Sequence, residues 1–434
     1  MIKKYALKIE TKLKGNAFFS NTIWIVGGKI FQMFLSLIIG MITARYLGPS
    51  NYGLIGYTAS YIAFFTAICN LGFTSTAVKE LIDIPEKQGT TLGTMIFFRI
   101  CSSIVSCFLV VGLVFILDDG DQIIVKVAFL QSLSLIFQSF EMITYWYQSK
   151  LKAQTSVKVQ TCGYLIMATY KIVILILQKD VTWFAFTTAM ESAAVALLLL
   201  VAYYKDQGQK LVVSFQRGKD MLKRSYHFIL SGLMGTVYGQ MDKIMLGQML
   251  NETTVGLYSA AMNISSMWNF ILMAIINSAQ PVIIASKEKN ESLYIKQIKR
   301  LYAAIIWIGF FVAGIICIFG KPIVWILYGE EYLEAANTLR ISLWYTIFAM
   351  LGTARGIWIV CENKARYVKY YLGIGAVVNI ILNYILIPHF GADGAASATL
   401  VTQIVTSLIA PLCFRETRIH TKYVIEAFFL KGIR

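Results

Sequence analysis

The sequence predicts an all-α membrane protein with about twelve transmembrane helices. Hydrophobic residues make up 57% of the 434 residues and charged residues only 14%, so the chain lacks the charged exterior of a soluble protein. The apolar residues occur in runs of about 20, the length of a helix that crosses the hydrocarbon core of a bilayer. Only 6 prolines interrupt these runs, which is typical of long helices.

The twelve predicted spans follow from these runs in chain order. They lie at roughly 20–44, 54–75, 92–117, 122–147, 157–178, 181–204, 225–249, 256–285, 301–328, 335–360, 367–388 and 393–414. The first run has no small-residue cleavage site, so we expect a span rather than a signal peptide. Because the backbone must satisfy its own hydrogen bonds in lipid, each span is expected to be helical.

The distribution of Lys and Arg predicts the orientation of the spans. With the N-terminus inside, the cytoplasmic segments hold 29 of the 39 basic residues and the external segments hold 5. Basic residues concentrate on the cytoplasmic side of membrane proteins, so both chain ends are expected in the cytoplasm. The net charge of +16 is then a topology signal that faces anionic lipid, and we expect no nucleic-acid partner.

The chain is expected to divide into two six-helix bundles, residues 1–210 and 211–434. The longest gap between spans, 205–224, falls near the middle, with six spans on each side. At an offset of 203, Leu47, Gly53 and Leu54 align with Leu250, Gly256 and Leu257. We therefore predict two parallel repeats related by a pseudo-two-fold axis along the membrane normal.

Two stretches outside the predicted spans look amphipathic, 291–303 and 417–434. Basic residues alternate there with aromatic ones, which indicates helices on the cytoplasmic surface.

The cysteines and histidines show no metal-binding spacing, and no nucleotide-binding or hydrolase signature occurs. We expect no catalytic residue, no metal and no cofactor.

Ionisable residues inside predicted spans are costly and indicate functional sites. Five are basic and three acidic: Lys29, Arg99, Glu141, Lys171, Glu191, Asp242, Lys243 and Arg355. The surplus of positive charge favours a cavity that binds phosphate or pyrophosphate, so the predicted substrate ligands are Lys29, Arg99, Lys171 and Arg355. The candidates for proton or sodium coupling are Asp242, Glu141 and Glu191. Two structural alternatives stay open: Lys171 pairs with Glu191, and Lys29 and Arg99 extend to the lipid headgroups.

Three segments resemble the Wzx-type polysaccharide flippases of the multidrug/oligosaccharidyl-lipid/polysaccharide (MOP) transporter superfamily. They are ARYLGPSNYG (44–53), YGQMDKIMLG (238–247) with VGLYSAA (255–261), and NIILNYILIPHFGADGAA (379–396). These motifs are interpreted as fold-defining rather than substrate-binding, because Gly391 and Gly394 break the chain and the small residues that follow allow close helix approach. The resemblance implies two six-helix bundles in a V shape around a central cationic cavity.

The resemblance also implies a function. The expected activity is transport of undecaprenyl-diphosphate-linked oligosaccharide units from the inner to the outer leaflet of the cell inner membrane, driven by an ion gradient. The expected partners are that lipid-linked substrate, membrane lipids, and the polymerase and chain-length proteins of the same pathway. Two alternatives remain: a cation-coupled multidrug exporter of the same superfamily, and a membrane polysaccharide polymerase or ligase. The surplus of basic residues argues against the first, and short predicted external loops argue against the second.

Overall fold

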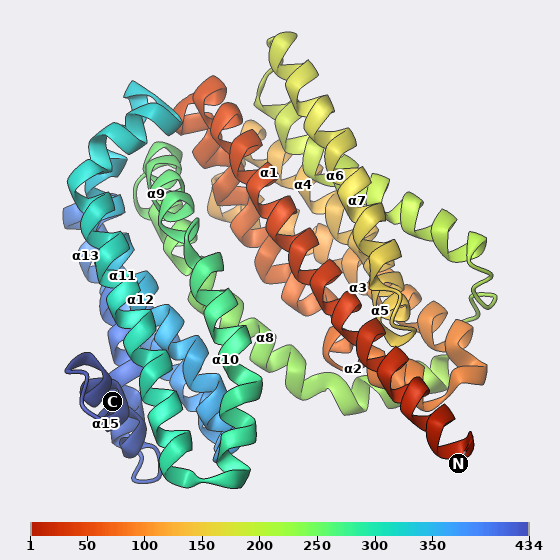
Figure 1. The fold of residues 1–434 in the computed structure, drawn as a ribbon. Coiled ribbons are helices and arrows are strands. Elements are labelled where there is room, and N and C mark those ends of the chain that lie inside the picture. Colours follow the sequence, from red (N-terminus) through yellow and green to blue (C-terminus); the bar gives the residue numbers. More distant parts are fainter. Residues whose placement is uncertain (1, 433–434) are drawn as a thin grey trace. The chain divides into compact units, whose positions relative to one another are not determined.

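The computed structural model describes the backbone of residues 2–432 and the side chains of residues 24–432, apart from Val26, Lys29 and Ser231. Every regular element in this part of the chain is a helix, as Figure 1 shows. This confirms the predicted all-α fold class.

The first half of the chain consists of α1 (Ile2–Cys69), α2 (Phe73–Asp83), η1 (Pro85–Lys87), α3 (Gln88–Leu117), α4 (Gln122–Gln138), η2 (Ser139–Glu141), α5 (Met142–Ser149), α6 (Ala153–Ile176) and α7 (Val181–Lys205). The second half consists of α8 (Phe215–Met249), α9 (Glu252–Ser266), α10 (Asn269–Lys289), α11 (Glu291–Tyr328), η3 (Glu330–Tyr332), α12 (Ala335–Cys361), η4 (Ala365–Tyr367), α13 (Val368–Ile404), the π-helix η5 (Val405–Ile409), α14 (Ala410–Cys413) and α15 (Arg418–Phe428).

Nine helical segments within the described residues are long and apolar enough to cross a membrane. Two of them, Ile30–Asp83 and Ala365–Cys413, each contain two of the predicted spans, with a kink at Gly48 or Gly391. The predicted span 225–249 lies in α8 but is not among the nine, because glycines, glutamines and the Asp242–Lys243 pair lower its hydropathy. The count of twelve spans therefore stays a prediction.

Large apolar side chains cover the outside of these helices, as expected for surfaces that contact lipid. Phe108 on α3 is 76% exposed and Ile318 on α11 is 73% exposed. In a soluble protein such side chains would be buried, since exposure of each costs about 1.5–3 kcal/mol in water. Their exposure is consistent with a hydrocarbon environment.

The helices form two compact units. Unit 1 contains residues 1–46 and 58–233, and unit 2 contains residues 47–57 and 234–434. The boundary between the units lies within α8, and residues 47–57 of α1 belong to the second unit. The predicted bundles of residues 1–210 and 211–434, their pseudo-two-fold axis and their V-shaped arrangement stay predictions.

Aromatic side chains form the core of unit 1 where α2, α3, α5 and α7 meet. Trp146 packs edge-on against Tyr203 at 4.7 Å between ring centroids, and Phe73 and Leu81 are fully buried beside them. The indole Nε1 of Trp146 donates a hydrogen bond to Gln88 at 3.1 Å, so its polar atom is satisfied inside the core. This core fixes α5 in place, which matters because α5 lines the cavity described below.

Two glycines allow an unusually close helix contact in unit 2. Gly48, at φ 70°, ends the first part of α1, and the chain then continues helically past Pro49 to Gly53. A Cβ atom on Gly53 would lie 1.7 Å from the carbonyl oxygen of Glu252, and one on Gly256 would lie 2.0 Å from that of Pro49. No side chain fits at either position, so the backbones of α1 and α9 touch directly.

This contact is reciprocal in the sequence repeat. The offset of 203 that aligns Gly53 with Gly256 also aligns Pro49 with Glu252. Gly53 packs against the carbonyl of Glu252, and Gly256 packs against the carbonyl of Pro49, the residue that aligns with Glu252. Each of the two repeated segments therefore needs a glycine where the other segment contacts it.

The C-terminal amphipathic stretch forms α15, which buries one face against unit 2. Its buried residues are His420, Thr421, Val424 and Ala427. The hydroxyl of Thr421 donates to the carbonyl of Leu408, and that of Thr417 donates to Pro411, each at 2.8 Å. These bonds satisfy carbonyls at the end of the preceding helix that have no partner within it. The stretch 291–303, by contrast, is not a separate surface helix, because α11 continues without a break from its cap at Asn290.

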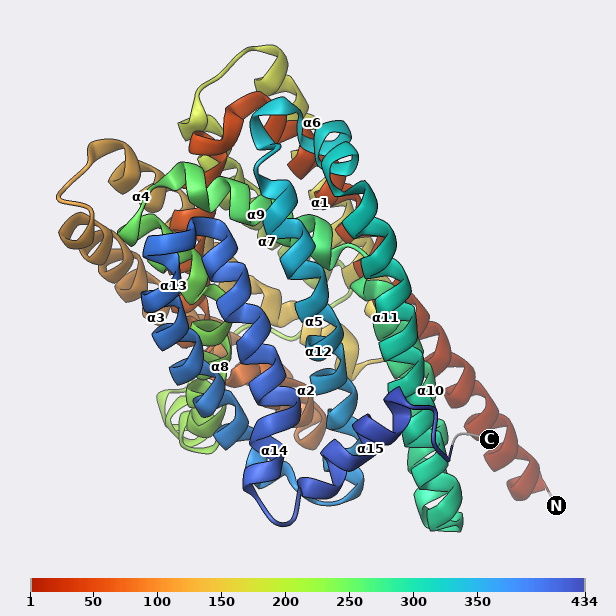
Figure 2. The same cartoon turned by 90° about the vertical axis from the view of Figure 1, so that its left-hand side faces the viewer.

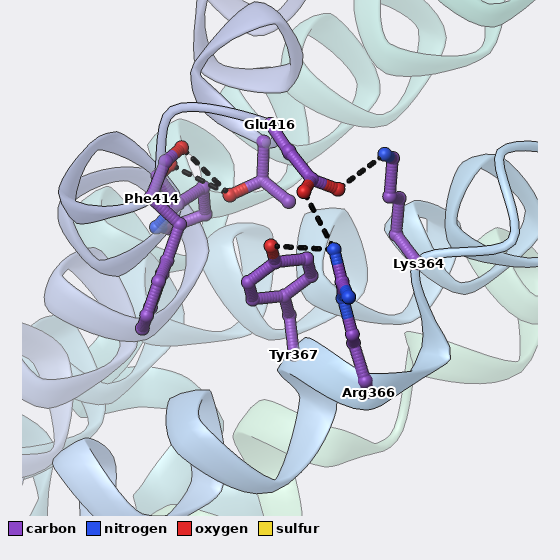
Figure 3. Close-up of polar contacts among 7 residues, drawn as sticks. Lys364, Arg366, Tyr367, Phe414 and Glu416 are labelled. Atoms are coloured by element: carbon purple, nitrogen blue, oxygen red, sulfur yellow. Dashed lines mark hydrogen bonds and ion pairs between the residues drawn. The ribbon is translucent and has the colours of Figure 1, made fainter.

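An ion-pair cluster joins two turns at the same end of unit 2 (Figure 2). Lys364 and Arg366, in the turn between α12 and α13, both bind Glu416 in the turn before α15 (Figure 3). Hydrogen bonds from Lys364 and then Arg366 lower the pKa of Glu416 to about 2. The cluster is solvent-exposed, so its contribution to stability is small.

The glycine contact gives a direct test of the fold. We expect Gly53→Ala to lower the stability of the purified protein by about 1–3 kcal/mol or more, because the backbone must separate to admit the methyl group. The matched control is Gly314→Ala on α11, where a Cβ atom meets nothing within 4 Å. The melting temperatures of Gly53→Ala and Gly314→Ala are compared in detergent, and equal values would contradict the close contact.

Candidate functional site

A polar cavity lies within unit 1, between α1, α5 and α6. Its volume is about 600 Å³, and its polar lining residues are Gln32, Glu141, Thr144, Tyr145, Gln148, Ser156 and Gln160. A neighbouring cavity of about 500 Å³ shares three of these residues and adds Tyr164, Glu191 and Ser192. The shared residues, Gln32, Glu141 and Gln160, make the two one connected polar surface, the unit 1 cavity. Amides and hydroxyls dominate this surface.

A break in the helix places Glu141 in this cavity. The 3₁₀ turn η2 separates α4 from α5, and Glu141 is its last residue. Ser139 in the same turn is fully buried, and the Ser103 hydroxyl donates to the Leu135 carbonyl at 2.9 Å just before it. The Glu141 side chain is open to the cavity although protein surrounds it. Mid-helix 3₁₀ turns of this kind frequently occur at functional sites.

The glutamines are held at defined positions on facing helices. Gln160 Nε2 donates to the hydroxyl of Thr144 at 3.1 Å, which links α6 to α5. Gln32 Nε2 donates to the hydroxyl of Thr161 at 3.4 Å, which links α1 to α6. A glutamine amide has two N–H donors and an acceptor oxygen, so each keeps capacity for a ligand.

Arg99 lies on α3 in unit 1 and is only 2% exposed. It interacts electrostatically with Glu141, and its Nε has no hydrogen-bond partner among the described residues. Arg99 does not extend to headgroups, since its side chain is buried. The predicted ligand Lys29 lies outside the described side chains.

Lys171 and Glu191 form an ion pair between α6 and α7. The Nζ and Oε2 atoms are 3.3 Å apart, and the side chains are 25% and 21% exposed. This is the pairing left open as a structural alternative. Glu191 also lines the unit 1 cavity, whereas Lys171 is not among its lining residues.

Asp242 is the centre of a polar cluster in unit 2. It lies on α8, is 4% exposed, and accepts hydrogen bonds from Asn379 at 3.0 Å and Asn383 at 2.6 Å. The hydroxyls of Tyr258 on α9 and Thr399 on α13 donate to its other oxygen. Four donors from two helices, α9 and α13, therefore meet one carboxylate, and Lys243, the next residue on α8, interacts with it electrostatically.

A sharp reversal of α13 makes this cluster possible. Gly391, at φ 54°, breaks the helix, and a Cβ atom on Gly394 would lie 2.4 Å from the Leu386 carbonyl oxygen. The two parts of α13 thus pack closely, and both Asn383 and Thr399 reach Asp242. The helix thus breaks at Gly391, as predicted, whereas Gly394 is helical and instead allows the close approach of the two parts.

Arg355 on α12 is buried in unit 2, at 8% exposed. Its guanidinium donates to the carbonyl of Thr406 at 2.6 Å and lies over the Tyr371 ring at 4.4 Å. Thr406 belongs to the π-helix η5, where wider turns leave carbonyls without their usual partner. Arg355 and Asp242 share unit 2, whereas Arg99, Glu141, Lys171 and Glu191 share unit 1.

The uncharged members of both sites were not predicted from the sequence. Charges inside the spans do not indicate Gln32, Gln148 and Gln160. The motif that contains Asn379 and Asn383 is interpreted above as fold-defining, although a spacing of four places both amides on one helix face. That spacing inside an apolar span was the available signal. Arg99, Lys171 and Arg355 are not among the lining residues of the unit 1 cavity, and their role in substrate binding stays a prediction.

The two sites differ in chemistry. The unit 1 cavity offers many weak, neutral hydrogen bonds over a long surface, which suits a polar ligand with many hydroxyl groups. The Asp242 cluster is small, buried and rich in oxygen atoms, which suits a proton or a small cation.

Comparisons with known proteins agree with the resemblance seen in the sequence. The sequence profile of the family described as polysaccharide biosynthesis protein matches residues 18–287, and the MatE profile matches residues 228–385. A "Putative O-antigen transporter" of Escherichia coli K12 is 21% identical over 399 residues, which covers 90% of this chain and 95% of that protein. A "Probable low-salt glycan biosynthesis flippase" of Haloferax volcanii is 26% identical over 200 residues, 45% of this chain. That match spans less than half of the relative, 42% of its length.

Solved structures show the same fold. The lipid II flippase MurJ in an inward closed conformation aligns with a TM-score of 0.68 at 14% identity, covering 93% of this chain and 91% of that one. Transporters of the MOP superfamily thus share the fold of this protein. With a family profile that matches more than half of its length, this chain belongs to the polysaccharide biosynthesis protein family and is a multi-pass membrane protein.

Proposed function

We propose that this protein is a flippase for lipid-linked oligosaccharides. It moves glycan units carried on undecaprenyl diphosphate from the cytoplasmic to the outer leaflet of the cell inner membrane by alternating access. The observation that carries the proposal is the unit 1 cavity, where Gln32, Gln160 and Glu141 form a polar surface inside an apolar helical unit. Polar groups at such depth are costly unless they serve a ligand. Amide and carboxylate groups pair with sugar hydroxyls, and the names of the relatives point to glycan transport.

The other functions fit the cavity less well. An exporter of cationic drugs needs carboxylates with free charge, whereas Lys171 pairs with Glu191 and Arg99 acts on Glu141. A polymerase or ligase needs reacting groups beside the substrate, and the named relatives are transporters. Both chain ends are proposed to lie in the cytoplasm, as the distribution of Lys and Arg indicates, and polymerase and chain-length proteins of the pathway are the proposed partners.

Substituting Gln160 tests the cavity. We expect Gln160→Ala to slow the flipping of a lipid-linked oligosaccharide in proteoliposomes about tenfold, since one lost hydrogen bond worth about 1.4 kcal/mol changes a rate or affinity by that factor. The matched control is Gln154→Ala, an exposed position on the same helix. Equal flipping by the two variants, at equal amounts of folded protein, would refute a substrate role for the cavity.

Variants of the Lys171–Glu191 ion pair test whether Lys171 stabilises the fold or binds the substrate. We expect Lys171→Met and Glu191→Gln each to lower the melting temperature. The double variant is expected to be more stable than the sum of the two single effects predicts, by about 0.5–3 kcal/mol, the interaction energy of residues in contact. The double variant is expected to flip substrate at close to the wild-type rate, because Lys171 serves mainly to neutralise Glu191. A stable double variant that does not flip would instead make Lys171 a substrate ligand.

Ion coupling is proposed at the Asp242 cluster. A proton would neutralise the buried carboxylate, and a sodium ion would bind it together with oxygens of Asn379, Asn383 and Thr399 after rotation of the amides. We expect Asp242→Asn to abolish the stimulation of flipping by an imposed proton or sodium gradient. Asp220→Asn, an exposed change on the same helix, is expected to keep it. Testing each gradient alone identifies the ion, and unchanged stimulation in Asp242→Asn would exclude this site.

A further inference from the structure

A second, apolar groove lies on unit 1 beside the unit 1 cavity. Its volume is about 960 Å³. Trp24, Gly27 and Phe31 of α1 form one side, and Cys162 and Leu165 of α6 form the other. All five are exposed in the structure, so the groove is open along its length.

A single thin wall separates the groove from the polar cavity. Gly28 and Val157 line both. A Cβ atom on Gly28 would lie 2.2 Å from Cγ1 of Val157, so α1 and α6 are in direct contact at this point. The same two helices therefore present amides such as Gln160 on one side of the contact and Leu165 on the other. A ligand with a polar part and an apolar part can occupy both sides at once.

A cation lies on the groove side of this wall. Lys158 is exposed, lines the groove, and places its Nζ 5.3 Å from the centre of the Trp24 ring. Among the described residues no carboxylate forms an ion pair with it. An ammonium beside an apolar groove attracts the phosphate of a lipid.

We propose that this groove binds the hydrocarbon chain of the lipid-linked substrate and that Lys158 binds its phosphate, while the glycan occupies the unit 1 cavity. The inference rests on the proposed function and gives it a binding mode within one unit. The apolar groove, the ammonium that lines it and the adjoining amide cavity match the three kinds of group in a prenyl-diphosphate-linked oligosaccharide. A phospholipid of the surrounding bilayer would match the groove and Lys158 but would leave the amide cavity empty.

Gly27 allows the groove to be filled without disturbing the fold. A Cβ atom on Gly27 meets nothing within 4 Å, so Gly27→Leu places a side chain in the groove rather than in a neighbouring helix. Gly40 lies on the same helix outside the groove and also has open space, so Gly40→Leu is the matched control. Any general effect of leucine on α1 appears in both variants.

The experiment measures binding to the full chain in proteoliposomes. The long-chain probe is an undecaprenyl-diphosphate-linked disaccharide with a photoreactive group in the prenyl chain. The short-chain probe, used for comparison, is the same disaccharide diphosphate on an eight-carbon chain. We expect Gly27→Leu to weaken binding of the long-chain probe about tenfold and to leave the short-chain probe unchanged. Lys158→Met is expected to weaken both probes alike, whereas Lys152→Met at the exposed position before α6 is expected to weaken neither. Photolabelling in the wild type is expected on α1 and α6.

Two results would overturn the inference. One is equal binding of the long-chain probe by Gly27→Leu and Gly40→Leu. The other is displacement of the photolabel by an equal concentration of phosphatidylglycerol, which would make the groove a site for bulk lipid. Failure of the proposed function is distinguishable, because the wild type would then not flip the long-chain probe at all.

Discussion

Hydrocarbon offers no hydrogen bonds, and the structure of this protein follows from that constraint. Each span satisfies its backbone as a helix, and at the last interruptions of the chain side chains bind backbone carbonyls. Arg355 binds the carbonyl of Thr406 in the π-helix, and the hydroxyls of Thr421 in α15 and of Thr417 just before it bind the carbonyls of Leu408 and Pro411. The interruptions that remain open to a ligand are therefore informative. Glu141 is the last residue of a 3₁₀ turn and faces a cavity, and Asp242 accepts hydrogen bonds from both parts of the reversed helix α13.

Close helix contacts set where these openings lie. Lipid is as apolar as the helix surfaces, so burying apolar area does not hold spans together, and packing at small residues takes that role. Gly53 and Gly256 bring α1 and α9 into backbone contact, and Gly28 allows the side chain of Val157 on α6 to pack directly against the backbone of α1. Helices that touch at one residue diverge on either side of it. The unit 1 cavity and the apolar groove are the two openings on either side of the Gly28 contact.

The features that were predictable from the sequence are those that a single helix carries. Apolar runs indicated the helices, Gly391 and Gly394 indicated the reversal in α13, and the 203-residue offset indicated a relation between Gly53 and Gly256. What the offset could not indicate is that the two glycines pack against each other's segments. Likewise, Asp242 was visible as a charge in a span, but its partners Asn379 and Thr399 come from distant positions. Such pairings depend on tertiary packing, which periodicity does not encode. Glutamines were missed because an amide costs less to bury than a charge and so gives a weaker signal.

The energetic role of the apolar groove follows from the same constraint. In water, burying a prenyl chain would contribute about 0.8 kcal/mol for each methylene. In a bilayer the chain leaves one apolar environment for another, so this term nearly vanishes and only packing remains. The groove therefore contributes only the packing of the chain against α1 and α6, which is the part of the affinity that Gly27→Leu is expected to remove. Its effect is to hold the chain beside the Gly28–Val157 contact, so that the diphosphate lies at Lys158 and the glycan meets the amides of Gln32 and Gln160. Specificity and most of the affinity then depend on the polar end of the ligand, whereas the apolar end adds packing and determines the orientation. Weak binding of the chain suits a transporter that must release its substrate into the opposite leaflet, because the free energy needed to release the lipid stays small.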